Sequence, residues 1–159
     1  MIKVLFVCLG NICRSPTAHG VFEAKVNSEG LTRQIDIDSC GTGSWHVGEA
    51  PDRRATAHAL KRGYELRHLR ARQVTTKDFY EYDYILAMDE ANLRELDLIA
   101  PTDAKTIPQL FLSYGDPVTC KGETEVPDPY YGGDQGFEHV LDLVESACEG
   151  LLEDIRMQL

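Results

Sequence analysis

Short apolar runs alternate with amphipathic segments along this chain, and this alternation is the feature that most constrains its fold. Runs that are short, apolar and rich in β-branched residues predict buried strands, and four are present: Ile2–Val7, Ile35–Ser39, Tyr84–Met88 and Thr106–Leu112. Strands that alternate with helices predict an α/β fold. We expect a three-layer sandwich whose four-stranded parallel sheet, of order 2-1-3-4, carries helices on both faces. The length of 159 residues suits a single domain over residues 1–159.

Helix boundaries follow from capping residues and periodicity. Ser15-Pro16 is typical of an N-cap followed by the first helical position, and Asp52 and Asp89 are further N-cap candidates. Thr75–Asp78 resembles a capping box. One apolar stripe predicts a long last helix; its members are Phe137, Val140, Leu141, Val144, Cys148, Leu151, Leu152 and Ile155. The preceding segment, Ser113–Gln135, is a long loop, and loops of that length are often functional.

Composition narrows the classes of partner and the compartment. The formal net charge of −10 disfavours a nucleic-acid partner. No stretch approaches the roughly 20 apolar residues of a membrane span, and the first apolar run is too short for a signal peptide. Five scattered cysteines, an odd number, predict reduced thiols and a cytoplasmic protein. The five histidines show no ligand spacing, so we expect no metal and no cofactor.

The loop between the first strand and the first helix carries the chemistry. Backbone N–H groups at a helix N-terminus form an anion site, and Gly10 and Asn11 tolerate the backbone conformations that such a loop needs. Five residues separate Cys8 from Arg14, which predicts a phosphate-sized cup with a guanidinium for two phosphoryl oxygens. The same groups favour a thiolate on Cys8. The expected phosphate-binding residues are Leu9, Gly10, Asn11, Ile12, Cys13, Arg14 and Ser15.

A nucleophile at the floor of a phosphate cup predicts phosphoryl transfer through a cysteinyl-phosphate. Ser15 could donate its hydroxyl to the thiolate and stabilise the sulfur when it leaves. The alternative is a buried cysteine and a surface arginine without chemistry. The apolar strand before the loop and the Ser-Pro helix start after it favour the functional interpretation.

Two motifs resemble those of the low-molecular-weight protein tyrosine phosphatase family. "VCLGNICRSP", residues 7–16, is similar to the signature loop, and "PDPYYG", residues 127–132, is similar to the general-acid loop. The likeness covers the whole chain in length and element order. It implies a metal-independent protein-tyrosine phosphatase that hydrolyses phosphotyrosine in protein substrates, with Cys8 as nucleophile, Arg14 as phosphate clamp and Asp128 as general acid and base. Phosphate and vanadate should then inhibit by occupying the cup.

Asp128 meets the chemical need for a proton donor to the leaving oxygen. Two prolines stiffen the backbone on either side of it. In a flavodoxin-like sheet, loops that follow the carboxyl ends of the strands converge on one crevice, which could bring Asp128 over the cup. The alternative is that Pro-Asp-Pro only forms a turn. An acidic pH optimum is expected, because the rate should fall as Asp128 loses its proton.

The resemblance also implies a substrate pocket and a supporting network. Trp45, Tyr130 and Tyr131, with Ile12, would line a deep slot for a phosphotyrosyl ring; the alternative is that these aromatic side chains fill the core. Asn11 and Ser39 would belong to a hydrogen-bond network that holds the cup. Asp89 would accept a hydrogen bond near Ser15, which is compatible with its role as a helix cap.

Some positions around the cup depart from the family pattern or leave alternatives open. Arg72 is expected to pair with Asp38. The family usually has a histidine three residues before that arginine, where this chain has Leu69, and His68 lies one residue earlier. Either the loop shifts by one residue or the network lacks its imidazole. Cys13 could form a reversible disulfide with Cys8 or pack as a small apolar side chain.

The sequence disfavours three rival functions. A thioredoxin-coupled arsenate reductase needs two further cysteines after the middle of the chain, and residues 73–95 contain none. A phosphoarginine phosphatase tends to have threonine at the position of Ile12, whose branched apolar side chain suits a phenyl ring better. A phosphate-binding module or phosphocarrier would need no general acid, so the Pro-Asp-Pro loop argues against it.

Overall fold

A four-stranded parallel sheet forms the middle layer of the structure, a computed structural model that describes residues 1–130 and 132–159. Its strand order is β2-β1-β3-β4, so the predicted order and the parallel pairing are confirmed. The strands are β1 (Ile2–Cys8), β2 (Ile35–Gly41), β3 (Tyr84–Ala87) and β4 (Gln109–Leu110).

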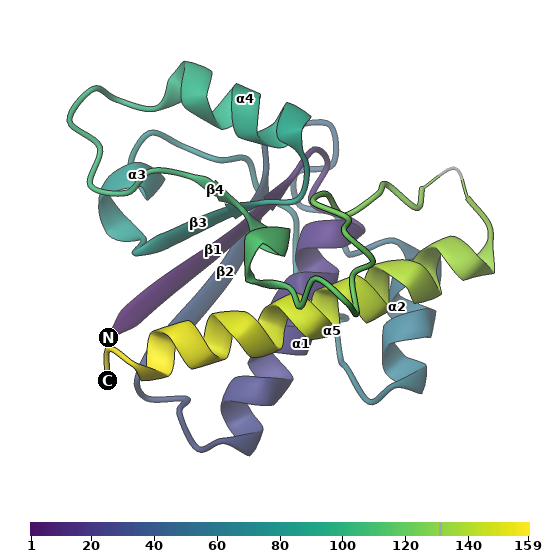
Figure 1. The fold of residues 1–159 in the computed structure, drawn as a ribbon. Helices are drawn as coiled ribbons and strands as arrows, with labels where there is room; N and C mark the ends of the chain where they lie inside the picture. The colour runs from purple at the N-terminus through teal and green to yellow at the C-terminus, as the bar shows by residue number, and fades with distance from the viewer. Residues whose placement is uncertain (131) are drawn as a thin grey trace.

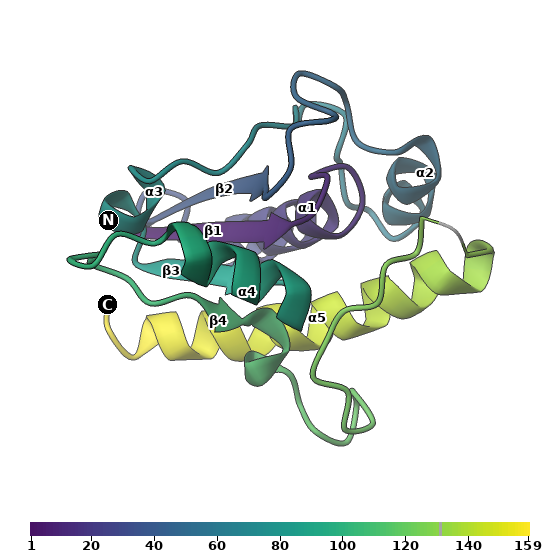
Figure 2. The same cartoon turned by 90° about the horizontal axis from the view of Figure 1, so that it is seen from above.

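Helices cover both faces of this sheet, as the alternation of strands and helices predicted (Figures 1 and 2). They are α1 (Arg14–Ser28), α2 (Arg53–Lys61), α3 (Asp78–Glu81), α4 (Glu90–Ile99), the 3-10 helix η1 (Phe111–Tyr114) and α5 (Asp134–Arg156). Successive side chains of a strand point to opposite faces. Val4 and Phe6 therefore pack in the cluster with α1 and α5, whereas Leu5 and Val7 pack in the cluster with α3 and α4.

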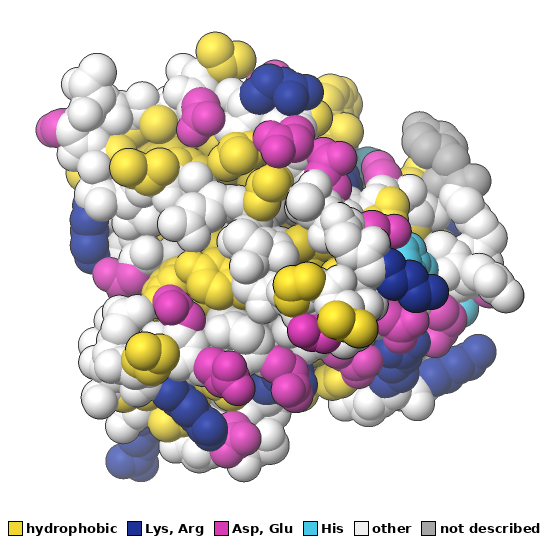
Figure 3. All heavy atoms as spheres, in the orientation of Figure 1, with side chains coloured by type: hydrophobic (Ala, Val, Ile, Leu, Met, Phe, Trp, Pro, Cys, Tyr) yellow, Lys and Arg dark blue, Asp and Glu magenta, His cyan; other side chains and the backbone are white. Residues whose placement is uncertain are grey.

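Aromatic rings fill the centre of the layer between the sheet and α5. The ring of Phe6 meets Phe22 and Phe111 edge to face, with centroids 5.8 and 5.1 Å away. All members of the predicted apolar stripe of α5 are buried. The opposite side of α5 carries acidic side chains, and Lys and Arg side chains lie among acidic ones on this face of the molecule (Figure 3). No helix among the described residues has both the length and the apolar character to span a membrane.

The fourth strand is shorter than predicted. The interpretation of Thr106–Leu112 as one strand is wrong, because only Gln109 and Leu110 pair with β3 and the chain then turns into η1. That turn buries Phe111 against Phe6, which outweighs the local preference for an extended run. The edge position predicted from Pro108 is confirmed.

The helix starts were predicted with mixed success. Asp52 and Asp89 cap α2 and α4 through side-chain bonds, as expected. Ser15 is not a cap, because α1 begins at Arg14 and its N-cap residue, Cys13, makes no side-chain cap. Near α3, the Asp78 carboxylate accepts from the backbone N–H of Thr75 at 2.8 Å, which is one half of the predicted capping box.

Candidate active site

The loop from β1 to α1 curls around the sulfur of Cys8. The backbone N–H of Asn11 points at Cys8 Sγ from 3.2 Å, and Ser15 Oγ lies 3.0 Å from the same sulfur. Asn11 reaches this position with a φ of 58°, a left-handed conformation that asparagine tolerates better than most residues. The sulfur thus faces the loop's polar groups.

A glycine at the end of β2 lets this strand approach the Cys8 loop closely. A Cβ on Gly41, the last residue of β2, would lie 2.6 Å from the carbonyl oxygen of Leu9. That distance is too short for real atoms, so the end of β2 packs against the Cys8 loop only because Gly41 lacks a side chain. Gly43 acts within the loop after β2, where a Cβ would lie 2.0 Å from the ring of Trp45.

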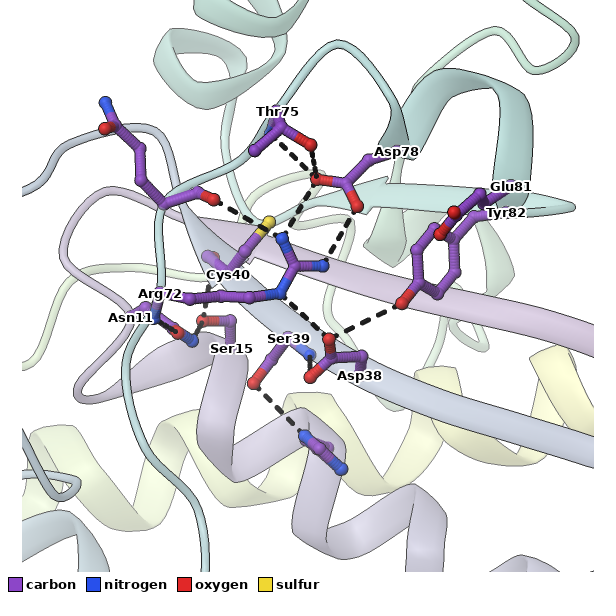
Figure 4. Close-up of polar contacts among 12 residues, drawn as sticks. Asn11, Ser15, Asp38, Ser39, Cys40, Arg72, Thr75, Asp78, Glu81 and Tyr82 are labelled. Atoms are coloured by element: carbon purple, nitrogen blue, oxygen red, sulfur yellow. Dashed lines mark hydrogen bonds and ion pairs between the residues drawn. The ribbon is translucent and has the colours of Figure 1, made fainter. Parts of the chain in front are cut away.

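Asn11 is held by hydrogen bonds at both ends of its side chain (Figure 4). Its amide Nδ2 donates to Ser15 Oγ over 2.7 Å, and its Oδ1 accepts the backbone N–H of Arg72 over 3.0 Å. The uncommon backbone of the loop is therefore fastened both to α1 and to the segment before α3. This contact also explains why Ser15 does not cap α1, since its hydroxyl serves Asn11 and Cys8.

The predicted Arg72–Asp38 pair is present, with Nε 2.9 Å from Asp38 Oδ2. The guanidinium also bonds Asp78 at 3.0 Å, so it joins β2 to α3 (Figure 4). Burial, and then the charge of Asp38, raise the pKa of the neighbouring Tyr82 to about 12. Arg72 thereby links the Asn11 loop to the carboxylate of Asp38 in β2 and to that of Asp78 in α3.

The histidine that contacts the supporting network near the cup is His19 of α1, not His68. Nδ1 of His19 lies 3.1 Å from Ser39 Oγ, and its Nε2 lies 3.3 Å from Glu23. His68 is half exposed and pairs with Glu23 at 2.9 Å on the surface, while Leu69 is buried. Sequence reasoning missed His19. The available signal was its place four residues after Ser15, on the same side of the helix.

Ser39 reaches the cup only indirectly. Its hydroxyl faces His19, and its backbone N–H donates to Asp38 Oδ1 over 2.8 Å. Asp38 in turn holds Arg72, whose N–H holds Asn11. The predicted network containing Asn11 and Ser39 therefore exists, with Arg72 between them.

Arg14 is aimed at the cavity by Asp89. Its side chain is only 4% exposed, and Nη1 donates to Asp89 Oδ2 over 2.6 Å and to the carbonyl of Val126 over 2.9 Å. Burial alone would lower the pKa of Arg14, but the adjacent charge of Cys8 and the bond to Asp89 raise it. Asp89 was expected near Ser15. It instead contacts Arg14 and caps α4 through the N–H of Asn92.

Asp128 lies across the cavity from the Cys8–Arg14 loop. Its Oδ2 is 3.9 Å from Arg14 Nη2, its Oδ1 accepts the N–H of Tyr130 over 3.0 Å, and its side chain is 44% exposed. Val126 anchors the same loop by donating its N–H to Met88 at the end of β3. The structure thus brings Cys8, Arg14 and Asp128 together, although 120 positions separate the first from the last.

Arg54 of α2 holds this acid loop and was missed by sequence reasoning. Its Nη2 donates to the carbonyl of Tyr130 over 2.6 Å, and its guanidinium lies 5.5 Å from the centre of the Tyr130 ring. It also stacks over Phe137 at 4.9 Å. No sequence motif marks such a contact, because it joins residues 76 positions apart.

These side chains enclose a cavity of about 210 Å³. It is lined by Cys8, Leu9, Gly10, Ile12, Cys13, Arg14, Trp45, His46, Asp128 and Tyr130. Trp45 is 72% exposed, so it forms a wall of the mouth and does not fill the core. Tyr131, predicted as a further wall, lies outside the described residues. His46 was not predicted, and its Nδ1 lies 2.8 Å from Glu49.

All five cysteines are free thiols in this structure. Burial, followed by the charge of Asp52, raises the pKa of Cys13 well above its ordinary value, so Cys13 is protonated. The reversible disulfide between Cys8 and Cys13 stays a prediction.

Comparison with known proteins agrees with this geometry. The sequence model of the family described as low molecular weight phosphotyrosine protein phosphatase matches residues 3–159. This chain belongs to that family. A low molecular weight protein-tyrosine-phosphatase of Streptomyces coelicolor is 45% identical over 157 residues, covering 99% of this chain and 95% of its own.

Solved structures of phosphatases share the fold over nearly the full length. A protein tyrosine phosphatase of Entamoeba histolytica, with Hepes in its active site, superposes with a TM-score of 0.93 at 40% identity and 99% coverage of both chains. A Drosophila protein described as an arginine phosphatase superposes with a TM-score of 0.89 at 33% identity and 98% coverage of both chains.

Proposed function

We propose that this member of the phosphatase family hydrolyses phosphotyrosine monoesters through a cysteinyl-phosphate, without a metal. One observation carries the proposal: Cys8 Sγ, the buried guanidinium of Arg14 and the carboxyl of Asp128 line a single cavity. Backbone and hydroxyl donors face the sulfur at 3.2 and 3.0 Å. The arrangement supplies a nucleophile, an anion clamp and a proton donor, which is what phosphate monoester cleavage requires.

In the first step, the Cys8 thiolate attacks phosphorus. An S–P bond forms as the bond from phosphorus to the phenolic oxygen breaks, and protonated Asp128 gives its proton to that oxygen. Arg14 and the loop N–H groups bind the non-bridging oxygens as their charge is redistributed. Tyrosine leaves as the neutral phenol.

In the second step, water attacks the cysteinyl-phosphate. The carboxylate of Asp128 now takes a proton from the water, the P–S bond breaks, and inorganic phosphate leaves. Ser15, 3.0 Å from the sulfur, stabilises the returning thiolate. The enzyme thereby regains both of its starting protonation states, and phosphate or vanadate should inhibit competitively.

The side chains that line the cavity favour a substrate whose phosphate is attached to a phenyl ring. Ile12, Trp45 and Tyr130 line this cavity together with the sulfur loop, and Tyr131 is proposed as a further wall. A phosphoserine side chain is too short to bring phosphorus to the sulfur from a mouth bounded by these rings. The five free thiols suit a reducing compartment, so the proposal includes a cytoplasmic location and one domain over residues 1–159.

Phosphoarginine is the second candidate substrate, because the Drosophila structure of similar fold is described as an arginine phosphatase. Ile12 opposes it here, since an apolar side chain offers no acceptor to a guanidinium. Matched peptides carrying phosphotyrosine or phosphoarginine separate the two possibilities. We expect kcat/KM to favour phosphotyrosine.

The experiment for the catalytic step is turnover of p-nitrophenyl phosphate with a chelator present. Wild type should be active and Cys8→Ser inactive. The matched control is Cys120→Ser, a buried cysteine outside the cavity, which should keep its activity if it stays folded by thermal melting. Full activity in Cys8→Ser would end the proposal.

A further inference from the structure

A second hollow, of about 460 Å³, adjoins the catalytic cavity. Leu9, Arg14, Trp45 and Asp128 line both spaces, so the two are continuous at the mouth. The remaining walls come from the loop after β2 and the first turns of α4; they are Thr42, Gly43, Asp89, Ala91, Asn92, Arg94 and Glu95. Arg14 and Asp128 lie in the wall that the two spaces share, whereas Cys8 lines only the catalytic cavity.

Two unused polar groups belong to the walls of this hollow. Among the described residues, Thr42 Oγ1 and Asn92 Oδ1 are the buried side-chain oxygens or nitrogens that have no hydrogen-bond partner. Asn92 is only 3% exposed. An unsatisfied buried group costs free energy, and a ligand bound in this hollow could supply a partner to both atoms.

The position of the hollow indicates which ligand this is. A phosphotyrosyl side chain that fills the catalytic cavity must join its main chain at the mouth, beside Trp45. Because the two spaces share a wall, the second hollow is within reach of the main chain on one side of that residue. This main chain carries one N–H donor and one carbonyl acceptor for each residue, which complements an amide oxygen and a hydroxyl.

We propose that this hollow binds the main chain of the substrate protein beside the phosphotyrosine. Asn92 Oδ1 accepts a substrate N–H, and Thr42 Oγ1 donates to a substrate carbonyl. Both side chains must rotate to make these bonds. Asn92 Oδ1 and Thr42 Oγ1 lose no hydrogen bond in this rotation, because neither atom makes one among the described residues. This inference rests on the proposed function and adds to it the part of the substrate that lies outside the ring slot.

The test compares kcat/KM for a phosphotyrosyl peptide with that for p-nitrophenyl phosphate, which has no main chain. In Thr42→Val and Asn92→Ala the peptide-to-nitrophenyl ratio should fall about fivefold, the size expected for one hydrogen bond. Thr102→Val, an exposed threonine outside the hollow, is the matched control and should leave the ratio unchanged. An unchanged ratio in both hollow variants overturns the inference.

Peptides with a methylated backbone nitrogen provide a second, independent test of the Asn92 contact. Methylation at the phosphotyrosine or at the next residue removes one N–H donor. One of these positions should lower kcat/KM in wild type by about fivefold and have no effect in Asn92→Ala, as in a double-mutant cycle. Equal losses in wild type and Asn92→Ala at both positions contradict the contact. A small molecule that binds the hollow without changing the peptide ratio also contradicts it.

Stability separates a binding role from a structural one. Because Thr42 Oγ1 has no partner, Thr42→Val should keep or raise the melting temperature while the peptide ratio falls. A falling melting temperature with an unchanged ratio assigns Thr42 to packing.

The outcomes also distinguish this inference from the proposed function. Wild type that fails to hydrolyse p-nitrophenyl phosphate rejects the proposed function and the subsite with it. Wild type that hydrolyses p-nitrophenyl phosphate, with a peptide ratio insensitive to Thr42 and Asn92, rejects the subsite alone.

Discussion

The guanidinium of Arg14 and the carboxylate of Asp89 form a 2.6 Å ion pair beneath the catalytic cavity. One nitrogen of the guanidinium is occupied by Asp89 and by the carbonyl of Val126. The other, Nη2, lies 3.9 Å from Asp128 and lines the space where substrate oxygens would sit. Asp89 thus acts as a positioning residue for the phosphate clamp.

Asp89→Asn should lower kcat/KM for p-nitrophenyl phosphate by about 10- to 100-fold, the range expected when a bond to a charged group is lost. The inhibition constant of inorganic phosphate should rise in parallel, because Arg14 is no longer held in place. Asp97→Asn, an exposed carboxylate of the same helix, is the control. Unchanged phosphate inhibition in Asp89→Asn would show that Asp89 only caps α4.

Asp128→Asn should lower kcat by about 10²- to 10⁴-fold, the usual contribution of a general acid. The loss should be greater for phenyl phosphate than for p-nitrophenyl phosphate, since the poorer leaving group needs its proton more. Asp116→Asn, in the same long loop, serves as the control. Equal losses for the two leaving groups would speak against an acid role.

Arg54→Ala should lower kcat several-fold, because Arg54 holds the carbonyl of Tyr130 and thereby the acid loop. The cleavage step should suffer more than phosphate binding, since the sulfur loop is untouched. The neighbouring exposed Arg53, changed to Ala, controls for the loss of one charge. If phosphate inhibition weakens as much as kcat falls, Arg54 instead supports the cup.

The Glu23 carboxylate should contribute to acid stability. The hydrogen bond from His19, followed by the charges of His19 and His68, lowers the pKa of Glu23 in the folded state. The contribution is therefore present above the unfolded value of about 4.3 and is lost as the pH falls through the lower folded value. The free energy of unfolding should differ between wild type and Glu23→Gln by less than about 1 kcal/mol at pH 6, since the site is partly exposed.

Chemical denaturation from pH 6 to pH 3 measures this difference. It should shrink below about pH 4, because the unfolded chain then binds a proton on Glu23 at a higher pH than the folded protein does. Glu95→Gln, an exposed carboxylate on α4, should show no such trend. A difference that stays constant over the whole range would mean that the variant acts through packing.

The features that lie close together in the chain were predicted best. β1, the Cys8–Arg14 loop and the start of α1 are one continuous segment, so their order follows from local hydrophobicity, turn residues and helix propensity. The strand order and the helix caps at Asp52 and Asp89 were also predicted correctly. The fourth strand was predicted too long, because burial of Phe111 against Phe6 decides where the chain turns.

By itself, the sequence determined the alternation of strands and helices, the spacing of a thiol and a guanidinium in one loop, and a carboxyl stiffened by two prolines. Only the tertiary structure decided that Asp89 positions Arg14 and that Arg54 hydrogen-bonds the loop of Asp128. It also decided that His19, and not His68, contacts Ser39. The physical reason is that these contacts join side chains far apart in the chain. Their partners depend on how the helices pack on the sheet, which no local pattern of residues encodes.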